Sequence, residues 1–131
     1  MEAKVSSLMR RGAITCAQDT SIQEVAQIMV VNRIRYCVVV DEKHEVKGII
    51  SNRSILKALG SDLEQTRAKD ILLPYTITIT PGTVLKDAAD LMARKRIEHI
   101  IVVSDRPGSK AIMGLLHADD VIARMAGDNG E

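Results

Sequence analysis

Aromatic residues are scarce in this 131-residue chain, which has two tyrosines and neither tryptophan nor phenylalanine. A platform of aromatic side chains on which nucleic-acid bases stack therefore has almost no residues to use. The 18 basic and 17 acidic residues give a formal net charge of +1 and are interspersed along the chain, so a basic stripe is lacking too. Both shortages argue against nucleic acid and against an anionic membrane as partners.

Long apolar runs are also missing. The longest, such as residues 36–40 and 100–103, are far too short to span a bilayer, and the N-terminus has no apolar signal core. The two cysteines, Cys16 and Cys37, lack the spacing of a disulfide framework, and together with three histidines they offer no metal-ligand spacing. We expect packed, reduced thiols, no metal site, and a soluble cytoplasmic protein.

Catalytic groupings cannot be assembled from the sequence either. It offers no Ser-His-Asp set, no paired carboxylates in a pocket-like context and no cysteine beside a basic group. Apolar residues make up 46% of the chain and charged residues 27%, which is ordinary for a globular protein. We therefore expect one compact, non-enzymatic module whose core consists of Val, Ile, Leu, Ala and Met.

What the chain does contain is an internal repeat. Identical residues recur at an offset of 63, and beyond a Pro-Gly turn at residues 107–108 the alignment continues at an offset of 66. The matched residues include Ile14-Thr15 with Ile77-Thr78, Ala26 with Ala89, Met29 with Met92, Arg33-Ile34 with Arg96-Ile97, Val39-Val40 with Val102-Val103, and Gly48 with Gly114. We expect one repeat over residues 1–62 and a second over residues 63–131.

Each repeat predicts the same order of elements, β-α-β-β-α, and hence a mixed α/β (α+β) fold. Short β-prone segments (14–17 and 77–80) precede amphipathic helices (21–33 and 84–96), and Ser21 with Glu24 has capping-box spacing. Continuous β-branched runs (36–40 and 100–103) and further strands (46–50 and 112–116) follow. The last helices run from Ser51 or His117 to Gly60 or Gly127.

In this order the residues of each copy resemble a cystathionine-β-synthase (CBS) domain. The first copy carries Val5-x-Ser7-Leu8-Met9, Arg33-Ile-Arg-Tyr36, Val38-Val-Val-Asp41 and Gly48-Ile-Ile-Ser-Asn-Arg-Ser54. The second carries Ala68-Lys-Asp70-Ile-Leu72, Arg96-Ile-Glu-His99 and Gly114-Leu-Leu-His-Ala-Asp-Asp120. The resemblance implies two CBS repeats packed about a pseudo-twofold axis, with two related clefts at their junction.

The nucleotide motif of that family is a glycine, two apolar residues, a serine or threonine, two further residues and an aspartate. The glycine lets a ligand approach the backbone, the hydroxyl and the helix N-terminus bind phosphate, and the aspartate accepts both ribose hydroxyls. The first copy has Ser54 in place of the aspartate, whereas the second keeps Asp120 but has His117 in place of the hydroxyl residue. The Asp120 cleft is therefore the better candidate.

Carried over from the family, each cleft combines the motif of one repeat with the first strand of the other. The Asp120 cleft would hold Ile14, Thr15, Ile34, Arg35, Tyr36, Gly114, Leu115, His117, Asp119 and Asp120. The weaker second cleft would hold Ile77, Thr78, His99, Ile49, Ser51, Arg53 and Ser54, with Glu98 repelling a phosphate. About one adenosyl ligand per chain is expected.

Ordinary structural roles remain open for several of these residues. Ser51 can simply cap its helix, Asp120 can satisfy a helix N-terminus without a ligand, and Arg35 can be a solvated strand residue.

The resemblance implies a regulatory module that senses AMP, ADP, ATP or a related ligand, needs no cofactor, and acts on an unidentified protein. It also implies a homodimer through the helix residues Ala26, Met29, Val30, Ala89, Met92 and Ala93. The alternative is a ligand-free CBS pair that serves only for dimerisation or protein docking.

Overall fold

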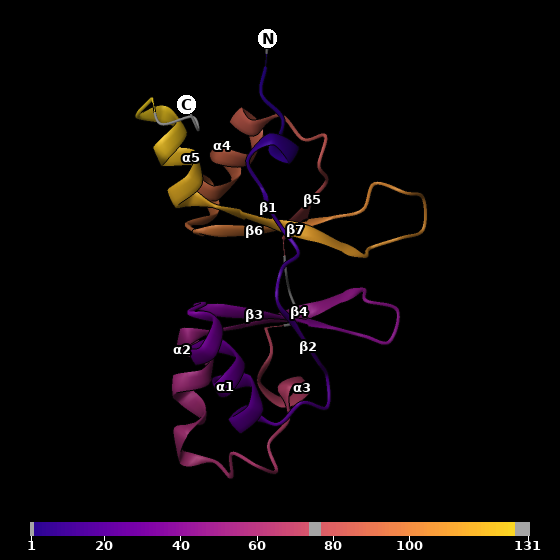
Figure 1. The fold of residues 1–131 in the computed structure, drawn as a ribbon, viewed down its shortest axis with the longest axis vertical. Helices are drawn as coiled ribbons and strands as arrows, with labels where there is room; N and C mark the ends of the chain where they lie inside the picture. Colours follow the sequence, from indigo (N-terminus) through magenta and orange to yellow (C-terminus); the bar gives the residue numbers. More distant parts are fainter. Residues whose placement is uncertain (1, 74–76, 128–131) are drawn as a thin grey trace. The chain divides into compact units, whose positions relative to one another are not determined.

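The β-branched runs form the central strands of two sheets in the computed structural model, which describes residues 2–73 and 77–127 (Figure 1). In the three-stranded sheet, β3 (Tyr36–Val40) lies between β2 (Thr15–Ala17), which is parallel to it, and β4 (Val46–Ser51), which is antiparallel. All five β3 residues are buried. This confirms the prediction of a strand covered on both faces, since its side chains alternate between them.

The four-stranded sheet repeats this arrangement and adds one strand. Its order is β1 (Arg10–Arg11), β7 (Ile112–His117), β6 (His99–Val103) and β5 (Thr78–Ile79). β5 runs parallel to β6, and β7 runs antiparallel to both β6 and β1. The extra strand β1 comes from the N-terminal end of the chain, more than 100 residues before its partner β7.

The helices follow the predicted periodicity within one or two residues. α1 (Ile22–Asn32) begins at Ser21, whose side chain accepts a hydrogen bond from the Glu24 N–H and confirms the predicted cap. α4 (Leu85–Lys95) is its counterpart. The last helix of each repeat is α2 (Asn52–Lys57), extended by the 3-10 turn η2 (Ala58–Gly60), or α5 (Ala118–Met125). Both repeats therefore have the predicted β-α-β-β-α order.

Two short helical elements were not predicted, η1 (Val5–Ser7) and α3 (Ala68–Ile71). Each is held by backbone contacts to a distant turn, since the Val5 N–H donates to the Thr83 carbonyl over 2.8 Å and the Ala68 N–H donates to the Thr20 carbonyl over 2.8 Å. Elements of three or four residues are too short to show a periodic apolar pattern, so the sequence did not predict them.

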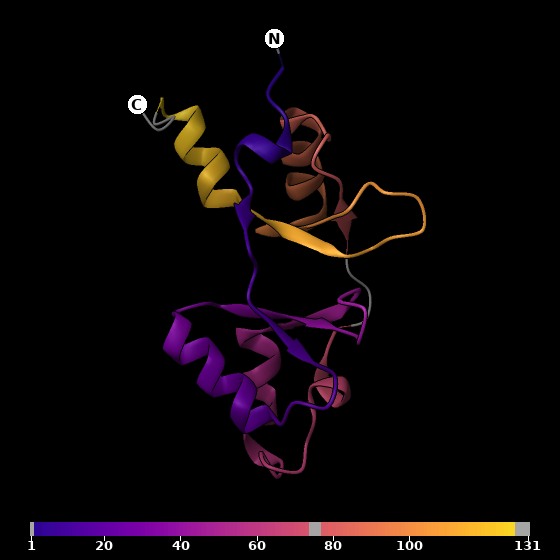
Figure 2. The same cartoon turned by 45° about the vertical axis from the view of Figure 1, so that its right-hand side comes forward.

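The chain divides into two compact units. The first unit is Ile14–Thr76, and the second unit combines Met1–Ala13 with Ile77–Glu131. This spatial division differs from the division into sequence repeats, because residues 2–13 join the second unit and residues 63–73 join the first. In each unit the helices α1 and α2, or α4 and α5, lie on one face of its own sheet (Figures 1 and 2).

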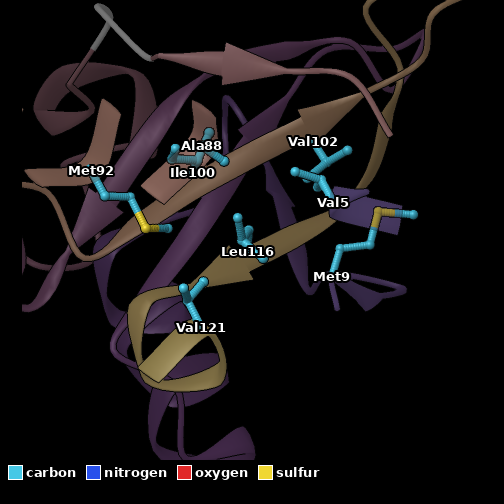
Figure 3. Packing of buried hydrophobic residues seen from close by; sticks show 8 residues of the cluster. All are labelled: Val5, Met9, Ala88, Met92, Ile100, Val102, Leu116 and Val121. Carbon is cyan, nitrogen blue, oxygen red and sulfur yellow. The ribbon is translucent and has the colours of Figure 1, made fainter. Parts of the chain in front are cut away.

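Each unit has its own apolar core, and the two cores are built from equivalent positions of the repeat. Figure 3 shows the core of the second unit, which consists of Val5, Met9, Ala88, Met92, Ile100, Val102, Leu116 and Val121. The core of the first unit consists of Cys16, Val25, Met29, Cys37, Val39, Ile50 and Ala68. Both cysteines are free and buried, as predicted.

The helix faces predicted to have surplus apolar area for a second copy of the chain are partly covered within their own units. Met29 and Met92 are only 5% and 6% exposed because they pack inside their own cores. Val30, from the same predicted face, is 76% exposed. Among the described residues, no helix combines the length and the apolar character needed to cross a membrane.

Candidate functional site

The strand-to-helix junctions carry the predicted motif residues, and they have the same backbone geometry in both units. In the second unit β7 ends at His117, and the first amide of α5, at Ala118, donates to the Glu98 carbonyl over 2.8 Å. In the first unit the Asn52 N–H donates to the Arg35 carbonyl over 2.9 Å. The residue before each central strand therefore fixes the start of the last helix of its own unit.

Cross-strand pairing places residues that were assigned to different predicted clefts opposite each other in each unit. Tyr36 lies opposite Ser51 in the first unit, and His99 lies opposite His117 in the second. Burial lowers the pKa of His99 below its ordinary value of 6.5, the nearby His117 lowers it further, and Glu98 opposes the shift. His99 is therefore neutral at neutral pH, which suits contact with an uncharged base or sugar better than contact with a phosphate.

Asp120 lies in the first turn of α5, where the helix dipole favours a carboxylate. Both of its oxygens accept hydrogen bonds from Arg10, with 2.9 Å between Nε and Oδ2 and 3.1 Å between Nη2 and Oδ1. The Asp120 side chain is 29% exposed and that of Arg10 is 57% exposed, so this bidentate ion pair is open to solvent. The predicted ribose-binding carboxylate thus has a cationic partner within its own unit.

Sequence reasoning missed Arg10, because the repeat alignment places Arg10 and Asp120 in different copies. At the offset of 63 residues Arg10 aligns with Leu73, and at the later offset of 66 Asp120 aligns with Ser54. Arg10 thus belongs to the sequence copy that lacks the aspartate and Leu73 to the copy that keeps it, and only the folding of the N-terminal residues into the second unit brings Arg10 beside Asp120. The distance of 110 positions between the two residues hid this relation in the linear sequence.

The motif glycines have close backbone neighbours within their own units. We expected Gly114 to let a ligand approach the backbone, but a Cβ atom there would lie 2.4 Å from the Arg10 carbonyl oxygen. Gly48 is equivalent, since its Cβ would lie 2.5 Å from the Leu73 carbonyl oxygen. Both positions therefore require glycine for a structural reason, because a neighbouring stretch of protein backbone fills the space that a Cβ atom would occupy.

Ser51 caps α2, which confirms the structural interpretation of this residue. Its Oγ accepts a hydrogen bond from the Ser54 N–H at 3.3 Å and lies 3.1 Å from the Ser54 Oγ. His117 occupies the same place before α5 and makes no side-chain cap hydrogen bond. The hydroxyls of Ser51 and Ser54 thus contact each other, and the Ser51 hydroxyl also caps the first turn of α2.

The remaining predicted residues are distributed over both units. Thr15 belongs to β2, Ile34 packs against the first core, Arg35 is exposed and Tyr36 is buried. Leu115 is buried in β7, Asp119 is exposed, and Thr78 is exposed in β5. The first unit thus contains Ile14, Thr15, Ile34, Arg35, Tyr36, Ile49, Ser51 and Arg53, and the second contains Ile77, Thr78, His99, Gly114, Leu115, His117, Asp119 and Asp120.

A cavity of about 360 Å³ lies in the first unit at the C-terminal ends of β2 and β3. Thr15 is its only lining residue from the predicted clefts, and the lining includes Asp19, Asp41 and His44. Asp41 bonds to the backbone N–H groups of residues 43 and 45, which lowers the pKa of its carboxyl. Within residues 2–73 and 77–127, no three His, Cys, Asp or Glu side chains form a group that could hold a metal ion.

Comparison with solved structures shows the same fold. The CBS domain pair of protein MJ0100, in complex with 5'-methylthioadenosine and S-adenosyl-L-methionine, is 25% identical and has a TM-score of 0.83 over 97% of this chain and 98% of that one. The cytosolic domain of the Mg2+ channel MgtE, in complex with ATP, is 25% identical with a TM-score of 0.77 over 89% of this chain and 46% of that one.

Curated sequences give a consistent result. Homoserine O-acetyltransferase of Methanosalsum zhilinae is 30% identical over 117 residues, which cover 89% of this chain and 23% of that protein. The chain spans between 23% and 58% of the lengths of the first curated relatives that it matches. The family model of the CBS domain matches residues 5–61 and again residues 68–127. The chain therefore belongs to the CBS domain family and carries two copies of the domain.

Proposed function

We propose that this CBS pair is a regulatory module that binds an adenosyl ligand and transmits its occupancy as a conformational change. The observation that carries the proposal is the position of Asp120. Its carboxylate is accessible to solvent and lies in the first turn of α5, which directly follows β7 and the motif glycine Gly114. The ligands named for the MJ0100 domain pair and for the MgtE domain are all adenosine derivatives. The shared adenosine group is therefore the part of the ligand that we expect this chain to recognise.

In this proposal the two hydroxyls of the ribose donate hydrogen bonds to Asp120. His117, when protonated, attracts a phosphate, and apolar strand residues such as Leu115 contact the adenine. The first amide of α5 takes no part, because the Glu98 carbonyl already accepts its hydrogen bond. Contributions of Thr15, Arg35 and Tyr36 from the first unit are predictions that mutation of each residue tests.

Calorimetric titration with AMP, ATP, adenosine and S-adenosylmethionine tests the proposal. Asp120→Ala should weaken binding about a hundredfold, since losing a charge-assisted pair of hydrogen bonds costs about 2 to 3 kcal/mol. Ser54→Ala is the matched control, because it changes the equivalent residue of the other repeat and should leave the affinity unchanged. A stoichiometry of about one ligand per chain is expected.

Three results would contradict the proposal. The first is the absence of both heat and thermal shift with every one of these ligands at millimolar concentration. The second is binding to two equal sites per chain. The third is binding that survives Asp120→Ala but is lost in Ser51→Ala, which would assign the ligand to the other motif.

A second candidate function is a ligand-free docking module. It is favoured by the changes at Ser54 and His117 from the family motif and by exposed apolar side chains on the helices, where Val31 is 78% and Met125 is 79% exposed. Such surfaces commonly mark a protein contact. This candidate predicts a homodimer with no ligand response, whereas a monomeric mass in light scattering at micromolar concentrations would contradict the dimer.

The remaining parts of the proposal concern the setting of the protein. The module acts on a separate protein, performs no catalysis itself and works in the cytoplasm, where its two buried free thiols stay reduced. Turnover of a nucleotide by the pure protein would contradict the non-catalytic role.

A further inference from the structure

We infer that Arg10 competes with the ligand for Asp120 and thereby sets the affinity of the site for ribose. This inference rests on the proposed function, because it concerns the same carboxylate. Arg10 holds both carboxylate oxygens, with distances of 2.9 and 3.1 Å. Two ribose hydroxyls that approach Asp120 use the same two oxygens, so they compete with the guanidinium for the carboxylate.

The backbone of Arg10 is held firmly while its side chain can move. Arg10 pairs with Leu115 in the β1–β7 ladder, and the absence of a side chain at Gly114 lets the Arg10 carbonyl approach closely. The Arg10 side chain, in contrast, is 57% exposed. An ion pair in such a solvated position is weak, which means that a ligand can displace it at moderate cost.

The first unit shows that this backbone arrangement does not require an arginine. Leu73 pairs with Ile49 and approaches Gly48 in the same way that Arg10 approaches Gly114. Leu73 is 50% exposed, and the position equivalent to Asp120 is Ser54. The guanidinium is therefore present in the unit that has a carboxylate to hold and absent from the unit that lacks one.

Adenosine is the suitable probe, because it carries the ribose but no phosphate that Arg10 could attract. Arg10→Gln should bind adenosine about two- to fivefold more tightly than the wild type, which corresponds to about 0.4 to 1 kcal/mol. Arg10→Lys keeps the charge but loses the bidentate fork, so an intermediate affinity is expected. Arg11→Gln is the matched control, since this exposed neighbour in β1 has its side chain on the opposite face of the strand.

The salt dependence of adenosine affinity is a second test, because an arginine with a purely structural role would not affect it. Raising the ionic strength from about 0.05 to about 0.5 M screens an exposed ion pair. Adenosine affinity of the wild type should therefore rise with salt, while that of Arg10→Gln should stay constant. AMP titrations of the same variants show whether Arg10 instead binds the phosphate.

The possible results separate this inference from the proposed function. Adenosine binding that is present in the wild type and equal or weaker in Arg10→Gln overturns the competition by Arg10 alone. Weaker AMP binding with unchanged adenosine binding in Arg10→Gln also overturns it and makes Arg10 a phosphate ligand. Failure of the wild type and of both Arg10 variants to bind any adenosyl ligand overturns the proposed function, and the competition along with it.

Discussion

The two repeats agree in their cores and differ at their strand-to-helix junctions. Equivalent core positions are occupied by Met29 and Met92, by Val39 and Val102, and by Ile50 and Leu116. At the junctions the equivalent pairs are Tyr36 and His99, Ser51 and His117, Ser54 and Asp120, and Leu73 and Arg10. Core residues must fill a fixed volume, whereas junction residues face fewer steric limits and can take up different chemistry. The same fold thus has hydroxyl and apolar side chains at one junction and charged and titratable side chains at the other.

The largest expected effect tests whether the two cores are equivalent. Ile50→Ala and Leu116→Ala should each lower the free energy of unfolding by about 2 to 5 kcal/mol, because each removes a fully buried side chain and leaves a cavity. Urea denaturation measures both values. Leu56→Ala, at a position that is 72% exposed, is the control and should cost under about 1 kcal/mol. A large cost in one unit and a negligible cost in the other would show that the cores are not equivalent.

Next in size is the effect of a methyl group at the motif glycines. Gly48→Ala and Gly114→Ala should each destabilise the protein by about 1 to 3 kcal/mol, because the new Cβ meets a backbone carbonyl that cannot move without disturbing its strand. Gly60→Ala has no atom within 4 Å of the added Cβ and serves as control. If Gly114→Ala keeps wild-type stability but loses ligand binding, the glycine serves the ligand after all.

A smaller effect distinguishes the helix starts. Ser51→Ala should cost about 1 kcal/mol, because it removes the oxygen that accepts the Ser54 N–H. The reciprocal change, His117→Ser, should stabilise the second unit by about 0.5 to 1 kcal/mol, since α5 has no side-chain cap. Thermal or urea unfolding measures both changes. Equal and negligible shifts in the two variants would show that capping does not distinguish the junctions.

The smallest expected effect concerns the pH dependence due to His99, whose counterpart in the first unit is Tyr36. The pKa of His99 is lowered below 6.5 in the folded protein, mainly by burial, so the folded state disfavours its proton. The resulting stability is present above pH 6.5 and is lost as the pH falls through the lowered pKa. His99→Gln should reduce this acid sensitivity. A proton NMR titration that gives His99 a pKa of 6.5 or higher would contradict the expectation.

The sequence by itself determined the repeat, its β-α-β-β-α order and the composition of the cores. These features depend on local periodicity, on caps such as Ser21 and on β-branched runs, all of which act over a few residues of chain. The family resemblance likewise came from motif order. Asp120 was selected from the sequence because a carboxylate in that position has few structural substitutes.

Tertiary structure alone decided which short segment joins which unit and what lies beside each motif residue. The ladder between β1 and β7 and the Arg10–Asp120 ion pair join residues about 110 positions apart, and a two-residue strand has no pattern of its own. The structural need for glycine at position 114 was hidden for the same reason, because the backbone that fills the space of its missing Cβ comes from the other end of the sequence. Such contacts form only once both partners have been brought together by the fold, so no local property of either segment predicts them.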